Sequence, residues 1–530
     1  MGFPLFLVLS FAAAASAQHA AHAVPSIPQA LLERPVIVRA GIGAAHDDAG
    51  TKSAEAQKFF DQGLAYLHNY VWIEAARSFN QALRLDPNLA LAQVGLSYAY
   101  VELNQSARAR QAIAAAQGLS VKASDHIKRH VTARSLQVAA EDAPGDTTKL
   151  SAYRKDLDAA IAAFPNDAEF LLLRGIAESP DPADRGQGSV TASIPYYERA
   201  LKAAPAHFGP HHFLAHAYEN SGRAKEAATE AAAYAAAASS VPHAVHMHGH
   251  ELRRLGRINE AIARFEAADK LQRDYLAREK IAPEFDWHLV HNLDLLAASY
   301  QYTGQMTKAE ALLKQSFNIP TNLLVQAVNK RAWPSFLLGR NRPAEALAAA
   351  QTLLTHPNPV MQATGYIEAG FAQLAMNKPA DGAQSSNAAL RALRAAPAGQ
   401  GLAAIELEAL QGEFLLRTGQ RDKGRTAMER AAQKWRGLPG PDAWTQALFR
   451  LEAEARTARA VGDWPLAARL SQVMLEHDSN YAGTHLALAL VAQHDGNAAT
   501  AKREAELAAR SWPLADHDLA ELKTIADLRR

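Results

Sequence analysis

Cysteine is absent from this chain of 530 residues. Its absence excludes disulfide bridges, thiolate metal sites and a lipidated amino-terminal cysteine, so any transition-metal site must use nitrogen and oxygen ligands. An excess of one charge is missing too, because 55 Lys and Arg stand against 54 Asp and Glu. Without a basic excess, nothing favours nucleic acid or an anionic membrane surface as a partner, and we expect neither.

Long hydrophobic runs are missing after the first residues, which read MGFPLFLVLSFAAAASAQ. There an apolar run ends in the small residues Ala15, Ser16 and Ala17, a pattern that predicts a secretory signal peptide at 1–17, cut before Gln18. The run is shorter than the ~20 residues that a transmembrane helix needs. We therefore predict no membrane insertion and a periplasmic or secreted protein.

Strand patterns are scarce as well. Residues 18–50, rich in Ala, His, Pro and Gly, predict an extended lead-in. Beyond them the chain is rich in Ala, the best helix former, and apolar residues recur at helical spacing. The sequence therefore predicts an all-α fold.

The segment AQKFFDQGLAYLHNYVWIEAARSFNQALRLDPN, which starts at residue 56, has the pattern of a helix–turn–helix unit of 34 residues. Small residues where two helices cross, aromatic residues between units and a proline after the second helix follow a fixed register; they are Phe59, Gly63, Tyr66, Ala75, Phe79, Ala82 and Pro87. In this register the segment resembles the tetratricopeptide repeat family. The resemblance implies a superhelical solenoid of stacked hairpins, with a concave groove that binds a protein or peptide.

The same pattern divides the rest of the chain. We expect N-terminal repeat units at 51–123, degenerate helical repeats with a loop at 124–190, His-rich units at 191–320 and C-terminal helical pairs at 321–530. Units in the His-rich part begin near residues 208, 242 and 290.

Histidine is concentrated in one stretch, since 10 of the 21 histidines lie between His207 and His291. In the tetratricopeptide family, fixed positions of the first helix of each unit line the groove. Carried over to this chain, those positions are His68, His212, His216, Glu219, Asn220, His243, His246, His250, His291 and Asp294. The resemblance therefore implies that imidazoles from three neighbouring units share one patch of groove, with His207, His211 and His248 outside it as surface or packing residues.

Neutral imidazole is a good ligand for zinc and copper, and nearby carboxylates can complete such a site. The metal hypothesis takes as direct ligands His212, His216, His246 and His250, with His243, His291, Asp294 and Glu219 as further ligands or supports. Two other interpretations stay open: a polar lining for a peptide or carboxylate ligand, and ordinary structural histidines.

A narrower resemblance concerns a group of secreted bacterial tetratricopeptide proteins with a His-rich centre and no assigned activity. It is carried by the pattern from His207 to Tyr218, by Pro242 to His250 and by the element Gly43 to His46. This likeness supports export and a purposeful histidine site, but it implies no reaction.

Catalytic motifs are absent. The pair His250 and Glu251 does not extend to H-E-x-x-H, and neither a phosphate-binding loop nor a G-x-S-x-G elbow occurs. The stretch 125–130, with two further histidines, predicts a solvated helix face. The leading hypothesis is an exported repeat protein that binds a protein or peptide; the alternative is a transition-metal-binding protein or metalloenzyme, so whether the protein is an enzyme stays open.

Overall fold

The computed structural model describes residues 26–321, 323–396, 401–438 and 443–530, so the predicted signal peptide and the start of the lead-in lie outside the described residues. In the described part every regular element is a helix, apart from one isolated bridge between Ala44 and His207. The all-α prediction is confirmed. None of these described helices combines the length and the apolarity needed to cross a bilayer.

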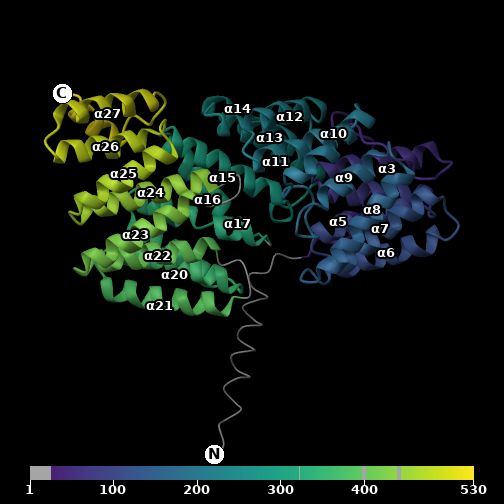
Figure 1. Cartoon of the computed structure of the whole chain (residues 1–530), viewed down its shortest axis with the longest axis horizontal. Helices are drawn as coiled ribbons and strands as arrows, with labels where there is room; N and C mark the ends of the chain where they lie inside the picture. Colours follow the sequence, from purple (N-terminus) through teal and green to yellow (C-terminus); the bar gives the residue numbers. More distant parts are fainter. Residues whose placement is uncertain (1–25, 322, 397–400, 439–442) are drawn as a thin grey trace, which may run out of the picture. The chain divides into compact units, whose positions relative to one another are not determined.

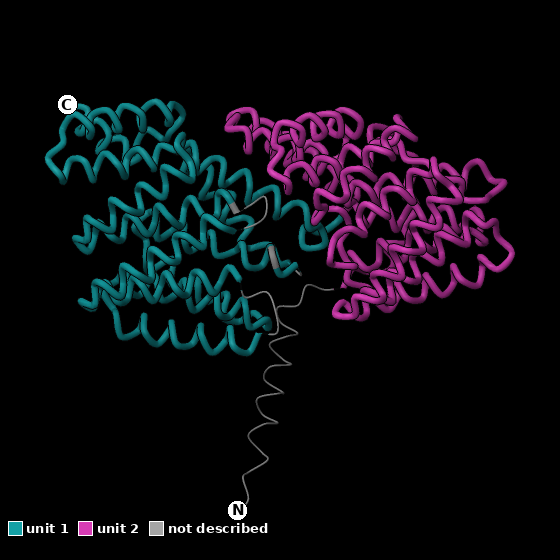
Figure 2. Tube along the Cα trace, in the orientation of Figure 1, with its two compact units in different colours: residues 1–24, 281–530 teal, residues 25–280 magenta. Residues whose placement is uncertain are grey.

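The helices form two compact units (Figure 2). We call residues 25–280 the N-terminal unit and residues 281–530 the C-terminal unit. The boundary falls within the segment 191–320 that carries the histidine cluster. His291 and Asp294 consequently belong to a different unit from the other predicted site residues.

The N-terminal unit is built from consecutive helices that pack as antiparallel hairpins. After the short α2 (Gln29–Leu32) they are α3 (Ala54–His68), α4 (Trp72–Leu85), α5 (Ala90–Glu102), α6 (Ser106–Ser120), α7 (Asp125–Glu141), α8 (Thr147–Ala163), α9 (Ala168–Ile176), α10 (Ile194–Ala203), α11 (Gly209–Asn220), α12 (Ala224–Ala237), α13 (Pro242–Arg254) and α14 (Ile258–Glu279). Side-chain oxygens of Ser53, Ser124, Asp146 and Asp167 accept hydrogen bonds from the first turns of α3, α7, α8 and α9. These caps explain why the helices begin where they do.

The C-terminal unit continues the same architecture. Its helices are α15 (Trp287–Tyr302), α16 (Met306–Asn318), α17 (Leu324–Asn329), α18 (Ala332–Gly339), α19 (Pro343–Leu353), α20 (Pro359–Ala375), α21 (Pro379–Ala395), α22 (Gly401–Arg417), α23 (Arg421–Arg436), α24 (Ala443–Ala460), α25 (Trp464–His477), α26 (Ala482–His494), α27 (Ala498–Ser511) and α28 (Ala520–Leu528). The pairs from α20/α21 to α26/α27 stack in sequence order (Figure 1). The all-α architecture thus continues through the C-terminal unit.

The C-terminal unit closes on itself. The indole N–H of Trp512 donates to the carbonyl oxygen of Tyr302 at 2.9 Å, and Arg340 pairs with Glu521 at 2.9 Å. These contacts join the end of the stack to its beginning. The first helices of successive hairpins therefore line a shared interior of the unit.

The N-terminal unit closes in a similar way. Arg77 of α4 pairs with Glu279 at the end of α14 at 2.8 Å, and the hydroxyl of Tyr275 donates to Glu74 at 3.3 Å. The first hairpin is thus tied to the last helix of the unit. The resemblance placed the histidine patch in an open groove. In this unit, the patch lies in a closed interior.

The lead-in occupies part of this interior. Residues 34–53, which we call the strap, are extended and bond to several hairpins. The amide of Asn69 donates to the Ile42 carbonyl oxygen at 2.7 Å, and the backbone N–H of Phe208 donates to the Ala44 carbonyl oxygen at 3.2 Å. Gly43 has φ +82, and a Cβ there would overlap the Phe208 ring, so only glycine fits. The strap joins α3 to the region of α11.

The Phe79 ring of α4 lies fully buried between two glycines, Gly63 of α3 and Gly95 of α5, and a Cβ at either would overlap it. We predict that Gly95→Ala lowers the free energy of unfolding by about 1–3 kcal/mol through overpacking. The control Gly118→Ala, on an exposed helix position with open space around it, should raise it by roughly 0.5–1 kcal/mol. Urea denaturation measures both, and equal stabilities for the two variants would contradict this packing.

Candidate functional site

Three imidazoles meet inside the N-terminal unit. His212 and His216 lie one turn apart on α11, and His243 lies at the start of α13. The Nε2 atom of His212 is 3.1 Å from Nε2 of His216 and 3.1 Å from Nε2 of His243. All three side chains are buried, and His212 is completely inaccessible to solvent. The structure thus brings together three of the predicted ligands from two neighbouring hairpins.

The hydrogen bonding of His212 fixes which nitrogen carries the proton. Its Nδ1 is 2.7 Å from the backbone carbonyl oxygen of His68, which can only accept, so Nδ1–H donates and Nε2 presents a lone pair. Burial, reinforced by the nearby His216, holds the pKa of His212 well below 6.5. His212 is therefore neutral at physiological pH, the form in which imidazole binds metals.

The spacing of the three nitrogens suits a cation better than hydrogen bonds among the rings. A neutral ring nitrogen has one in-plane lone pair, so Nε2 of His212 cannot accept two N–H groups well at once. Nitrogens bound to zinc at about 2.0–2.1 Å in tetrahedral geometry lie about 3.3 Å apart. The observed distances of 3.1 Å between the Nε2 atoms are close to that nitrogen–nitrogen separation.

Aromatic rings enclose this trio. The ring centroids of Tyr70 and Tyr234 lie 4.6 and 4.5 Å from that of His212. Their hydroxyls point elsewhere, because Tyr70 donates to the Arg185 carbonyl oxygen at 2.9 Å and Tyr234 to the Asn69 side-chain oxygen at 2.8 Å. Burial raises the pKa of both phenols well above 10. They shield the trio from bulk solvent and are not candidate ligands.

Behind the trio, His68 and His207 share one buried carboxylate, Glu169. Its oxygens are 3.0 Å from Nε2 of His68 and 2.8 Å from Nε2 of His207. Burial pushes the pKa of Glu169 up, but the two imidazoles outweigh it and the pKa falls below the usual range. Nδ1 of His207 accepts the Gly209 N–H at 3.0 Å, so both of its nitrogens are engaged. This group positions the His68 carbonyl that orients His212.

His68 lies deeper than expected. It was expected to line the groove and is 6% exposed, and His207, expected as a surface or packing residue, is buried and pairs with Glu169. Closure of the unit and the strap over α3 and α11 account for the burial of His68. Asn220 stays exposed, and its amide donates to the Gln187 and Ser189 carbonyl oxygens at 2.8 and 3.0 Å.

His246 and His250 do not join the trio. Nδ1 of His250 is 2.9 Å from Glu219 and 3.9 Å from Glu251. Burial, together with the nearby Glu219, raises the pKa of Glu251 to about 7. The fully buried His246 lies between the two groups and packs against Phe265, with ring centroids 5.1 Å apart. Of the four histidines expected as direct ligands, the structure brings His212 and His216 together with His243. It does not bring His246 and His250 to the same place.

Sequence reasoning missed a further cluster. Asp47 of the strap, His126 and His130 of α7 and Asp167 before α9 offer ligand atoms that all lie within 4.8 Å of one another. The stretch 125–130 was expected to be solvated, yet His130 is 6% exposed. Hydrogen bonds with Asp167 and Asp47 raise the pKa of His126 to about 10, which places a proton among these carboxylates. The i, i+4 spacing of the histidines was a visible signal, but their partners are distant in sequence.

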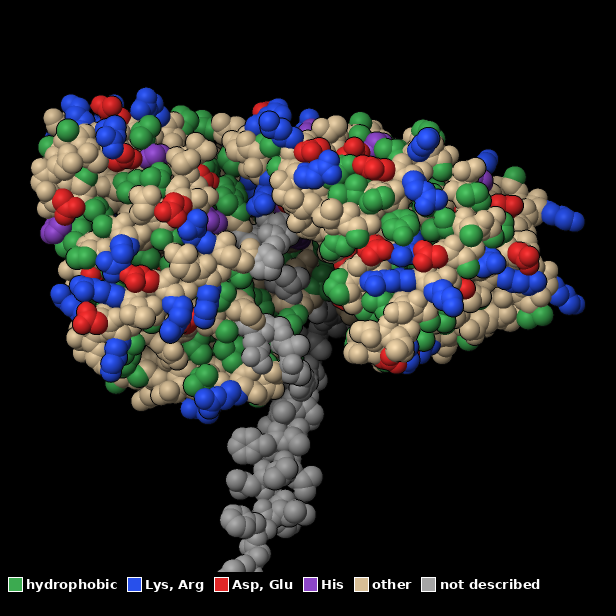
Figure 3. Space-filling model, in the orientation of Figure 1, with side chains coloured by type: hydrophobic (Ala, Val, Ile, Leu, Met, Phe, Trp, Pro, Cys, Tyr) green, Lys and Arg blue, Asp and Glu red, His purple; other side chains and the backbone are tan. Residues whose placement is uncertain are grey.

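Little of this histidine chemistry reaches the surface. On the face shown in Figure 3, Lys and Arg are mixed with Asp and Glu over both units, and histidine shows only in small patches. The clusters described above lie inside the N-terminal unit.

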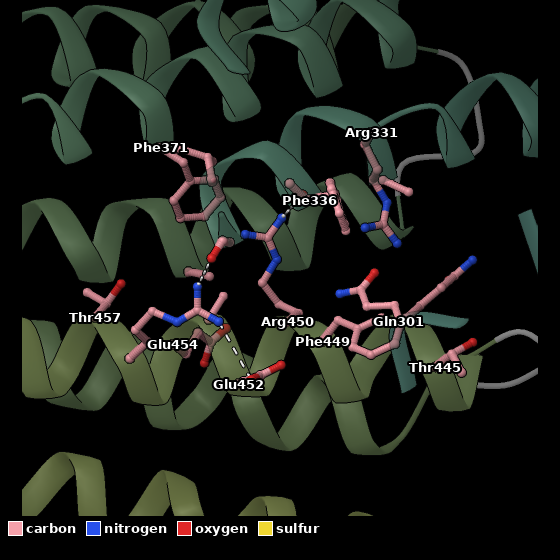
Figure 4. Close-up of a pocket in the computed structure, with 18 of the residues that line it drawn as sticks. Gln301, Arg331, Phe336, Phe371, Thr445, Phe449, Arg450, Glu452, Glu454 and Thr457 are labelled. Atoms are coloured by element: carbon pink, nitrogen blue, oxygen red, sulfur yellow. Dashed lines mark hydrogen bonds and ion pairs between the residues drawn. The ribbon is translucent and has the colours of Figure 1, made fainter. Parts of the chain in front are cut away.

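The C-terminal unit contains a cavity of about 430 Å³. It lies among α15, α18, α20, α22 and α24 and is lined by the rings of Phe336, Phe371 and Phe449 and by several charged side chains (Figure 4). His291 and Asp294 line it as well, and Asp294 accepts a hydrogen bond from Ser316 at 2.5 Å. These two predicted ligands therefore face an apolar and charged cavity of their own unit.

Buried charges form one wall of the cavity. Arg450 of α24 extends over the Phe371 ring (Figure 4), and it pairs with Glu368 at 2.8 Å and Glu406 at 3.1 Å. Burial raises the pKa of Glu454, one turn further along α24, to about 8. The wall thus offers both a fixed guanidinium and a carboxylic acid that is largely protonated at neutral pH.

Comparison with known proteins identifies the repeat. Residues 242–275 match the family model of the tetratricopeptide repeat. The chain contains a tetratricopeptide repeat. The matched segment spans α13 and most of α14, and it begins where the second of the three His-rich units was predicted to begin. The register that placed His243 on the inner side of a tetratricopeptide unit is thereby supported, while the likeness to the secreted His-rich group stays a prediction.

No curated protein matches the chain. Solved structures that resemble it include the APC/C hetero-tetramer Cut9–Hcn1 (11% identity, TM-score 0.31, 90% of this chain and 97% of that chain) and yeast Tom70 (13%, 0.30, 90% and 89%). A human IFIT1 dimer with PPP-AAAA is also similar (10%, 0.34, 88% and 95%). Likenesses at such low TM-scores carry no information about function.

The raised pKa of Glu454 predicts how the stability of the protein depends on pH. Its folded pKa of about 8 lies above the ordinary 4.5, so between these values the unfolded chain releases a proton that the folded chain keeps, and stability falls as pH rises. Glu454→Gln should equal the unaltered protein near pH 4.5 and exceed it at pH 8.5 by on the order of 4 kcal/mol.

The control has the opposite sign. Burial raises the pKa of Glu408, but hydrogen bonds from Lys434 and Arg430 outweigh it and lower the pKa. Glu408→Gln should therefore lose stability above pH 4.5. Urea denaturation across this pH range measures both variants, and a Glu454→Gln difference independent of pH would contradict the assignment.

Proposed function

We propose that this tetratricopeptide-repeat protein is exported and binds a segment of a partner protein in the cavity of its C-terminal unit. Export rests on the amino-terminal sequence pattern alone. Partner binding rests on the stacked hairpins, an architecture that presents extended binding surfaces. The observation that carries it is the cavity of about 430 Å³ among the first helices of successive hairpins.

The lining of the cavity has the character of a recognition site. Ligand sites are mostly apolar with a few fixed polar groups that set orientation. Here three phenylalanine rings provide the apolar surface, and Arg450, held by Glu368 and Glu406, provides a guanidinium in a fixed orientation whose charge these carboxylates balance. Such a lining fits a peptide segment with an apolar side chain beside a hydrogen-bonding group.

Filling the cavity tests partner binding. Ala298 lines the cavity, and Ala298→Trp should block it while leaving the surrounding core in place. We expect a partner captured from periplasmic extract by the unaltered protein to be lost with this variant. The matched control is Ala348→Trp, on an exposed position of α19, which should capture the same partner. Capture that is identical for both variants would contradict binding in the cavity.

A second candidate function is supported by the histidine trio. We propose that His212, His216 and His243 bind a transition-metal ion, zinc or copper. The main observation in support is that the Nε2 atoms of His216 and His243 each lie 3.1 Å from Nε2 of the neutral His212, which presents its lone pair to them. Three protein ligands leave a position for water or another molecule, as in catalytic zinc sites, so metal storage, transfer and metal-assisted chemistry are all compatible with the site.

Metal analysis of tag-free protein tests the trio. The unaltered chain should retain or take up a transition metal, and His243→Ala should weaken its binding by at least about 10-fold to 100-fold. His248→Ala is the matched control, because His248 is half-buried on the same helix and belongs to none of the clusters. Affinity should fall at acid pH, below the usual imidazole value of about 6.5, because burial holds the pKa of His212 well below that value. Equal affinity of the two variants would refute the trio as ligands.

A further inference from the structure

We propose that Asp47, His126, His130 and Asp167 form a second metal site, a closed four-ligand centre for a divalent ion of the zinc class that clasps the strap onto α7 and α9. We call it the clasp site. It shares no residue with the histidine trio, so it stands or falls independently of the functions proposed above.

The four residues come from three separate segments, each held by other contacts. His126 and His130 lie one turn apart on α7, and the His130 ring stacks on Phe170 with centroids 3.9 Å apart. Asp167 caps α9, where Oδ1 accepts the Phe170 N–H at 3.0 Å and Oδ2 faces the histidines. The strap backbone at Asp47 is fixed by the side-chain amide of Gln57, which donates to its carbonyl oxygen at 2.7 Å. The ligands are therefore oriented before an ion binds.

The distances fit one shared ion. Nε2 of His126 is 2.7 Å from Asp167 and 3.2 Å from Asp47, and Nε2 of His130 is 3.3 Å from Asp47 and 3.9 Å from Asp167. Ligands of a tetrahedral zinc ion at about 2.0–2.2 Å lie about 3.3–3.5 Å apart. Two of the four observed distances match this separation, one is shorter and one is longer, and all four ligand atoms lie within 4.8 Å of one another, so side-chain adjustments of up to about 1 Å would complete the shell.

A simple cluster of ion pairs accounts less well for His130. Its Nε2 is buried and pairs with both carboxylates, at 3.3 Å from Asp47 and 3.9 Å from Asp167, but neither contact is a well-aligned hydrogen bond. Burying a polar atom without a hydrogen bond costs free energy, whereas a metal would use that nitrogen directly. His126 alone would suffice to join the two carboxylates.

Charge and ligand number indicate the role. Once the ion displaces the proton that His126 carries, two carboxylates and two neutral imidazoles around a divalent ion give a net charge of zero, which suits a partly buried site. Four protein ligands leave no open position, as in structural zinc sites, in contrast to the three ligands of the trio. The ion would join the strap to helices about 80 and 120 residues later in the chain and so restrict loop freedom in the unfolded chain. Its role is to fasten the strap.

Zinc titration of the full-length, tag-free, EDTA-treated protein tests the clasp site. Asp47→Asn and His130→Gln should each lose one zinc equivalent, or bind it at least about 10-fold to 100-fold more weakly than the unaltered chain. The matched controls lie in the strap beside the site: Asp48→Asn, whose carboxylate accepts from the Gly50 N–H, and His46→Gln, which pairs with Asp61 at the surface. Both controls should bind as the unaltered chain does.

Protease digestion gives a second readout. Zinc should slow cleavage within residues 34–53 in the unaltered chain and in His243→Ala, but not in Asp47→Asn. If Asp47→Asn and His130→Gln bind as much zinc as the controls, the cluster is an ion-pair network only and the proposal fails.

A third measurement covers the case in which the ligand variants do not fold. Crystals of the unaltered protein equilibrated with zinc should give an anomalous scattering peak among the four side chains. Crystals with zinc at the trio but none among these four residues would overturn the proposal.

Discussion

Closure of each unit on itself is the constraint on which the rest of this structure depends. A stack of helical hairpins with an open inner face would leave its inner residues in water, where histidines and glutamates need no partners. Here Arg77 with Glu279 in one unit, and Trp512 with Tyr302 in the other, tie the last helices to the first. The inner faces become interiors, and every polar group on them must be neutral, paired or bound to a ligand.

The two units meet this requirement with different chemistry. In the N-terminal unit the inner polar groups are mostly imidazoles, which are neutral when buried, as His212 is, or charged when paired with carboxylates, as His126 is. In the C-terminal unit they are guanidinium and carboxylate groups that pair with each other beside phenylalanine rings and leave a cavity. An interior of imidazoles suits a transition metal, whereas a cavity with fixed charges suits an organic ligand or peptide.

The strap shows why sequence patterns could not delimit the site. Its residues have no helical periodicity, and the sequence predicts only that they are extended. In the structure it places Ala44 beside His207 and Asp47 beside His126, and thus supplies part of the polar interior. Asp47 has no sequence signal that distinguishes it from Asp48, because only the path of the strap decides which carboxylate turns inward.

The sequence by itself determined the helices, the register of the repeats and the inward direction of His212, His216 and His243, since the spacing of small and aromatic residues fixes how hairpins pack. Only the tertiary structure decided which of the inward histidines meet. His243 joins the trio while His250 pairs with Glu219, and His291 belongs to the other unit. The physical reason is that periodicity sets the direction of a side chain from its own helix axis, whereas the curvature of each unit and the course of the strap set the distances between side chains on different helices.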